Sequence, residues 1–185
     1  MQRLALREVV PLPAPACFAL IADVAAYPRF LPHCADARIL STAASGATTT
    51  TTAQLTIAFM ALSVKYTSLV EAIHPHTVRA RAVSFDVFDT LDTEWRFSPV
   101  PPSLLLQSTT HRNNLASVLA SRHSPYQQPP PPPPPPRPTH TQVDFSIAFK
   151  FNNPIYNATA RFFLNTMARD MMAAFHARAS DLNRV

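Results

Sequence analysis

Large apolar residues alternate with small or polar ones near the end of the chain, in TQVDFSIAFKF, residues 141–151. On an extended strand, successive side chains point to opposite faces of the sheet. One face then carries Val143, Phe145, Ile147, Phe149 and Phe151. This pattern predicts a β-strand whose apolar face must pack against another layer of structure.

Several earlier stretches show the same alternation, and together they predict an antiparallel sheet. Gly46, the only glycine of the chain, follows Ser45 between two of these stretches and marks a hairpin turn. The predicted earlier strands are residues 3–10, 35–43, 48–59, 62–73, 77–85 and 89–97. Their inward faces include Leu55, Ile57, Phe59, Leu62, Val64, Tyr66, Leu91, Thr93, Trp95 and Phe97.

Two segments have helical spacing instead. Residues 14–31 predict a helix that Pro28 ends or kinks. A second helix of about 27 residues closes the chain, with Asn153 as its cap and Pro154 at its first position. Its apolar stripe is predicted to comprise Ala160, Phe163, Leu164, Met167, Met171, Ala174 and Phe175, and to lie along the sheet.

Proline dominates the second half of residues 99–138, between the last two strands. Because proline cannot donate to a sheet ladder and favours polyproline II, we expect this segment to be a disordered loop insertion outside the fold. The rest fits one domain spanning residues 1–185, of the α+β class, with the long C-terminal helix lying across a curved antiparallel sheet.

The composition narrows the range of functions. The formal charge of +5 is spread thinly without a basic cluster, so nucleic acid is not an expected partner, whereas an anionic membrane surface stays open. Two cysteines are too few for a disulfide framework, which favours a reducing compartment. Neither a signal peptide nor a transit peptide is visible at the N-terminus.

His33 and Cys34 are adjacent in the proline-flanked stretch YPRFLPHCADARIL, residues 27–40. A zinc or Cys-His catalytic site needs further ligands or an orienting partner, and neither Asp23 nor Asp36 has a recognised spacing from the pair. We therefore expect no metal site and no catalytic residue here. We predict a rigid corner in which Cys34 is a small buried residue.

Six segments in this order resemble the coenzyme Q-binding START-domain family, which is related to the polyketide cyclase/dehydrase and lipid transport superfamily. They are VAAYPRFLPHCADARIL, AQLTIAF, VKYTSLVEAIHPHTVRA, FDTLDTEWRFSP, VDFSIAFKFNNPIYN and FFLNTMARDMMAAFHARA. The resemblance covers most of the chain outside residues 99–138. It departs from the family at His33, where an aromatic is expected, and at FMALS, residues 59–63, in place of a Phe-Pro-Pro-like stretch.

The resemblance implies a START/Bet v 1-like helix-grip fold with a hydrophobic tunnel that binds ubiquinone. It implies a lipid chaperone, not an enzyme and without a catalytic cofactor, that supports quinone synthesis and respiratory electron transport. Its place would be the matrix side of the mitochondrial inner membrane, in peripheral contact with the bilayer and with quinone-biosynthesis proteins.

The predicted ligand-binding residues come from two sources. By the resemblance, Tyr27, Phe30, Leu31, Pro32 and Cys34 form a corner at the tunnel mouth, with Tyr66, Trp95 and Phe97 on the sheet. The inward positions of the predicted strands and helix add Leu55, Ile57, Phe59, Phe145, Ile147, Phe149, Phe163, Met167 and Met171.

Two other functions stay open. A cyclase or dehydratase needs an acid or base in the pocket, and the inward sheet positions offer Tyr66 and Thr93 but no Asp, Glu or His. A ribosome-binding module needs a basic face, which Arg161, Arg169 and Arg178 do not form on one helix. Ile155 and Phe162 are expected opposite the buried stripe, as an exposed apolar patch for a membrane or partner.

Overall fold

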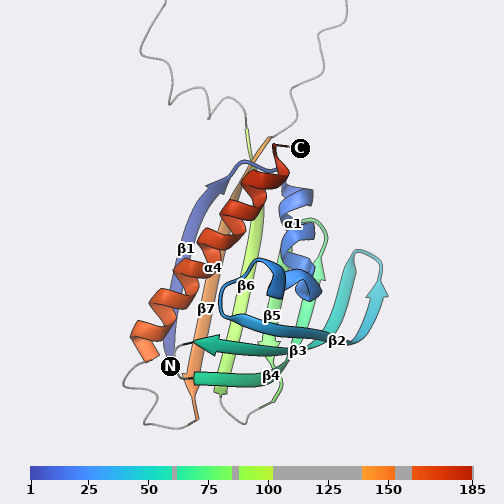
Figure 1. Ribbon diagram of the computed structural model, residues 1–185. Coiled ribbons are helices and arrows are strands. Elements are labelled where there is room, and N and C mark those ends of the chain that lie inside the picture. The colour runs from blue at the N-terminus through green and yellow to red at the C-terminus, as the bar shows by residue number, and fades with distance from the viewer. Residues whose placement is uncertain (60–61, 85–87, 102–138, 153–159, 185) are drawn as a thin grey trace, which may run out of the picture.

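Seven antiparallel strands form one sheet in the computed structural model, which describes residues 1–59, 62–84, 88–101, 139–152 and 160–184 (Figure 1). The spatial order is β1-β7-β6-β5-β4-β3-β2, so only β1 lies beside a strand that is distant in the sequence. The strands are β1 (Gln2–Val10), β2 (Cys34–Ser45), β3 (Thr48–Phe59), β4 (Leu62–Ile73), β5 (Thr77–Ala82), β6 (Phe88–Val100) and β7 (His140–Phe151).

The helices of the described ranges lie on one face of this sheet: α1 (Ala14–Ala22), the 3-10 helix η1 (Val24–Arg29) and α4 (Ala160–Leu182). Figure 1 shows α4 crossing the sheet diagonally over β1, β7 and β6, with α1 beside it. This arrangement confirms the predicted α+β helix-grip fold, a curved antiparallel sheet around a long C-terminal helix. β5 ends at Ala82, earlier than the predicted strand 77–85, whose residue 85 lies outside the described residues.

The alternation in β7 identifies the core face correctly. Val143, Phe145, Phe149 and Phe151 are buried and Ile147 is partly buried, whereas Lys150 between them is exposed. The Phe145 ring packs 4.2 Å from the Trp95 ring on β6. Because burying a phenylalanine contributes roughly 1.5–3 kcal/mol, this row of β7 is a main source of stability.

The buried face of α4 differs from the predicted stripe. The buried residues are Leu164, Ala168, Met172, Phe175 and Ala179, while Met167, Met171 and Ala174 are only partly buried. The stripe is rotated because α4 packs mainly against β1 and β7, at one side of the sheet. Asn153 and Pro154, the predicted cap, lie outside the described residues, as do the side chains of Ala160 and Phe163.

The first helical segment is interrupted earlier than predicted. α1 ends at Ala22, Asp23 leaves the helical conformation with φ −79° and ψ 72°, and Pro28 lies inside η1 rather than at its end. The Tyr27 hydroxyl donates a hydrogen bond to the carbonyl of Ile21. The last carbonyls of a helix lack intrahelical partners, so this bond satisfies one of them as the chain folds back.

The β2–β3 hairpin turns at Gly46 as predicted. Ser45 pairs with Thr48, which leaves Gly46 and Ala47 as the turn. Gly46 has φ 59°, in the left-handed region that glycine enters without strain.

The two strands that flank the proline-rich segment pair up to its ends, since Val100 lies opposite His140. Replacing residues 101–139 with the two-residue turn Asn-Gly should therefore change the melting temperature by only a few degrees. The entropy cost of closing a loop grows only logarithmically with its length, and Asn-Gly suits a two-residue hairpin. Thermal unfolding followed by circular dichroism tests this, and loss of a cooperative transition would place the segment within the fold.

Candidate functional site

A cavity of about 100 Å³ lies between α4, the corner that follows α1, and the inner face of strands β3 to β6. Eight predicted ligand-binding residues line it: Tyr27, Leu31, Leu55, Ile57, Tyr66, Trp95, Met167 and Met171. Pro32 and Cys34 of the corner line it as well. The full lining comes from seven elements, η1, β2 to β6 and α4, and from the loop that carries Leu31 and Pro32.

Small residues on β5 explain why the sheet is hollow here. Ala80 faces the cavity, while the neighbouring strands contribute the large rings of Tyr66 and Trp95. On the opposite wall, Met167 and Met171 of α4 are only partly buried. Because the sheet is deepest where its side chains are shortest, α4 spans this part without filling it.

The other predicted residues pack in the core or at its edge. Phe30 contacts Tyr27 and Phe175, Phe59 contacts His33, and Phe97 contacts Phe18. Phe145 packs against Trp95, and Phe149 packs against Phe88 and Phe151. Ile147 packs against the core. The side chain of Phe163 is not among those described.

Sequence reasoning did not select several lining residues, namely Val24, Ser68, Val70, Val78 and Ala80, and noted Thr93 only as an inward position. Alternation shows which residues point inward but not which of them border empty space. The alternation of arginine with alanine in TVRARA was the available signal, since short side chains between bulky strands leave a hollow.

The corner is held by packing and by polar contacts of His33. Tyr27 packs edge-on against Phe30 at 6.0 Å and Phe175 at 5.8 Å. His33 has φ 71°, and its Nε2 lies 3.0 Å from Oδ2 of Asp170 on α4. Its ring lies 4.9 Å from that of Phe59. His33 thus connects the corner to α4 and to the end of β3.

Cys34 is a buried thiol in the cavity wall. Burial raises its pKa to about 11, with the neighbouring Asp36 carboxylate adding to the effect. Among the described residues, no group of three or more His, Cys, Asp or Glu could hold a metal ion. The thiol of Cys34 is therefore protonated near neutral pH and weakly nucleophilic.

The lining carries hydroxyl groups and one thiol but no carboxylate, histidine, lysine or arginine among its residues. Burial raises the pKa of Tyr27 and of Tyr66 well above the usual range of tyrosine. Both phenols therefore stay neutral hydrogen-bond donors at physiological pH. Such a wall suits a neutral ligand with a large apolar surface.

α4 is tied to the body of the protein on both of its sides. His33 pairs with Asp170, and Nδ1 of His176 lies 2.5 Å from Oε1 of Glu8 on β1. These pairs are partly exposed, so each contributes about 0–1 kcal/mol. They position the helix over the cavity while apolar packing supplies most of the binding energy between helix and sheet.

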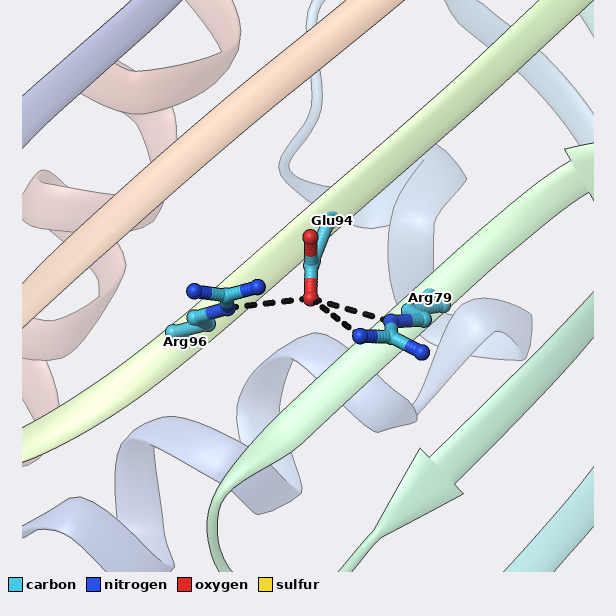
Figure 2. Close-up of polar contacts among 3 residues, drawn as sticks. All are labelled: Arg79, Glu94 and Arg96. Atoms are coloured by element: carbon cyan, nitrogen blue, oxygen red, sulfur yellow. Dashed lines mark hydrogen bonds and ion pairs between the residues drawn. The ribbon is translucent and has the colours of Figure 1, made fainter.

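Charged residues cover the outer face of the sheet in opposed pairs. Figure 2 shows Glu94 on β6 between Arg79 and Arg96, at 2.8 Å and 3.0 Å. Arg7 of β1 pairs in the same way with Asp144 of β7. Burial works against ionisation of Glu94, but hydrogen bonds from Arg96 and Arg79 outweigh it and hold its pKa below the usual range.

A larger open hollow of about 620 Å³ lies on this outer face, with Ala5, Ser146 and Ala148 among its lining residues. Its charged residues, including Arg81 and Asp92, alternate in sign across paired strands. The hollow follows from short side chains on an exposed, twisted sheet. The cavity beneath α4 is the better candidate because it is less open and lined mainly by buried or partly buried apolar side chains.

Among the described side chains of α4, Phe162 is the most exposed large apolar one, at 63%. Ile155, the other predicted member of its patch, lies outside the described residues. None of the helices in the described ranges has the length and hydropathy to cross a membrane.

Comparisons with known proteins agree with this architecture. A family model described as polyketide cyclase / dehydrase and lipid transport matches residues 10–176. The mitochondrial coenzyme Q-binding protein COQ10 homolog B of Xenopus laevis is 25% identical over 160 residues, which are 86% of this chain and 50% of that protein. The mitochondrial coenzyme Q-binding protein COQ10 of Saccharomyces cerevisiae is 24% identical over 187 residues, covering 100% of this chain and 73% of that protein. The chain thus spans half the length of the first relative.

Solved structures show the same fold at low identity. A START superfamily protein from Mycobacterium smegmatis matches with a TM-score of 0.67 and 12% identity, covering 97% of this chain and 98% of that one. The Zhui aromatase/cyclase from Streptomyces matches with a TM-score of 0.66 and 11% identity, covering 97% and 93%.

Both cysteines should react slowly with iodoacetamide in the folded protein at pH 8. Burial raises the pKa of Cys17 and of Cys34 to about 11. About one such thiol in a thousand is ionised at pH 8, against roughly a quarter for an exposed cysteine. Alkylation should speed up about tenfold between pH 8 and pH 9, as the thiolate fraction does. Intact-mass spectrometry measures it, and equal rates in native and urea-unfolded protein would contradict the burial.

Proposed function

Because the chain belongs to the polyketide cyclase/dehydrase and lipid transport family, we propose that it binds ubiquinone as a lipid chaperone. The observation that carries this proposal is the partly enclosed cavity between the sheet and α4, whose lining has no charged residue. Relatives named coenzyme Q-binding proteins, similar over 86–100% of the chain, support the choice of ligand.

Apolar contact supplies the affinity in this proposal. Each buried methylene of an isoprenoid tail contributes about 0.8 kcal/mol, so a few isoprenoid units suffice without a charged contact. Met167 and Met171, at the wall formed by α4, have flexible thioether side chains that adapt to the shape of a ligand. The cavity can therefore enlarge by rotamer changes at these residues when the ligand enters.

We propose binding without turnover. An acid–base reaction near neutral pH needs a group that changes protonation there, whereas the titratable lining groups are phenols and a thiol with raised pKa values. The alternative function, a cyclase or dehydratase, would need an acid or base that these residues do not supply. The other alternative function, ribosome binding, would need a surface with excess positive charge. On the outer face of the sheet, Arg7, Arg79 and Arg96 are each paired with a carboxylate, which offsets their charge.

The relatives named as mitochondrial suggest the same compartment for this protein. We place it at the matrix side of the inner membrane, in peripheral contact with the bilayer and with quinone-biosynthesis proteins. There it would support quinone synthesis and respiratory electron transport by keeping a water-insoluble quinone available to enzymes.

Purified wild-type protein should carry about one equivalent of ubiquinone. The Met167→Asp substitution should abolish ubiquinone binding, because the new carboxylate would be buried against the isoprenoid tail. Lipid extraction and mass spectrometry measure the bound quinone. Ala173→Asp, at an exposed position of the same helix, is the matched control and should retain the ligand. His33→Ala should retain most of it, because His33 does not line the cavity. A folded Met167→Asp protein with a full equivalent would refute the site.

Phe162→Asp should weaken sedimentation with anionic liposomes severalfold if Phe162 contacts the bilayer, because an exposed ring inserts into the interface and a carboxylate is repelled. Asn165→Asp adds the same charge at another exposed position of α4 and should have a smaller effect. Equal binding of Phe162→Asp and wild-type protein would exclude this contact.

A further inference from the structure

We infer that the ligand lies in the cavity with its ring innermost, in a ring-first orientation. The oxygens of a neutral quinone ring accept hydrogen bonds from three hydroxyl groups of the sheet, and the tail points toward the corner and α4. This inference rests on the proposed function and adds to it the direction in which the ligand lies. The three hydroxyls belong to Tyr66, Ser68 and Thr93, which we call the hydroxyl floor.

The hydroxyl floor surrounds the hollow on β5. Tyr66 and Ser68 are two residues apart on β4, so both point inward, and Thr93 lies on β6. Ser68 is opposite Ala82 and Thr93 is opposite Ala80, so the strand between them carries only methyl groups at these positions. The floor is therefore polar at its margins and open at its centre.

The donors of the hydroxyl floor are weakly engaged or uncommitted. The Ser68 and Thr93 hydroxyls donate to the carbonyl oxygens of Arg81 and Ala80 at 3.4 Å, at the long end of the range for hydrogen bonds, so a ligand oxygen can compete for each proton. The Tyr66 hydroxyl makes no hydrogen bond to any described residue. Ser68 is also one of the most buried polar residues described, with 3% exposure.

A hydrocarbon tail against this floor would leave the Tyr66 hydroxyl without a partner and the Ser68 and Thr93 hydroxyls with only their long bonds, which is unfavourable once the ligand displaces water. Carbonyl and methoxy oxygens on a quinone ring accept hydrogen bonds from such donors. Burial keeps the Tyr66 phenol protonated by raising its pKa, so it is a donor throughout the physiological range.

The opposite wall has the complementary character. Leu31 and Pro32 of the corner and Met167 and Met171 of α4 offer carbon and sulfur atoms to the ligand. The volume of about 100 Å³ is below the roughly 150 Å³ of an apolar cavity that holds benzene, so the cavity must widen at Met167 and Met171 before it takes up a substituted ring. In this orientation the tail lies between the corner and α4.

Trp95 allows a direct test, because it is the only tryptophan of the chain and lines the cavity. A quinone ring quenches tryptophan fluorescence at close range, whereas an isoprenoid alcohol does not. We would titrate the full-length protein with decylubiquinone, and measure geranylgeraniol, a tail without a ring, by competition. Wild-type protein should show strong quenching by decylubiquinone.

Tyr66→Phe removes one hydroxyl and keeps the ring. It should weaken decylubiquinone binding about fivefold to tenfold and leave geranylgeraniol binding unchanged, as expected for one hydrogen bond. Thr93→Val should act in the same direction. Thr67→Val is the matched control, because Thr67 lies between Tyr66 and Ser68 on β4, does not line the cavity and should not affect the preference between the two ligands.

The outcomes separate the two proposals. If wild-type protein binds decylubiquinone but Tyr66→Phe and Thr93→Val bind it equally well, or if both variants lose both ligands equally, the ring-first orientation is wrong while quinone binding stands. If wild-type protein does not bind decylubiquinone at all, the proposed function itself is wrong. Melting temperatures of the variants verify that each is folded.

Discussion

The fold depends on burying one apolar face of the antiparallel sheet beneath α4. β7 supplies a row of buried phenylalanines to that face, and the ring of Phe175 on α4 packs 4.9 Å from the ring of Trp95 on β6. α4 lies chiefly over β1 and β7, so it covers only one side of a sheet that curves away from it. The corner after α1 covers much of the rest, and the cavity lies between these two covers.

The chemistry of the cavity follows from this incomplete contact. A side chain that packs against the helix is large and apolar, as Phe145 is, whereas one that borders the gap can be short or carry a hydroxyl. Ala80, Ser68 and Thr93 are of the second kind. The same geometric mismatch therefore provides both the space for a lipid and the few polar groups that could orient it.

The stretch around His33 and Cys34 shows that a chemically suggestive pair can have a structural role. His33 connects the corner to α4 through Asp170, and its carbonyl accepts a hydrogen bond from the amide of Ala58 at 2.8 Å. Cys34 lies in the cavity wall with its thiol protonated. His33, a departure from the family pattern, thus connects the corner to α4 and to the end of β3.

Local patterns in the sequence determined the strands, the turn at Gly46, the inward face of β7 and the presence of a long terminal helix, because alternation and turn preference depend on near neighbours. Together with the family resemblance, which supplied Tyr27 and Leu31, they indicated eight of the residues that line the cavity. Only the tertiary structure decided which inward residues meet the helix and which border the gap. Met167 and Met172 are both apolar residues of α4, yet Met172 is buried and Met167 faces the cavity. That choice depends on the curvature of the sheet and the position of α4 across it, which arise from contacts between residues far apart in the chain.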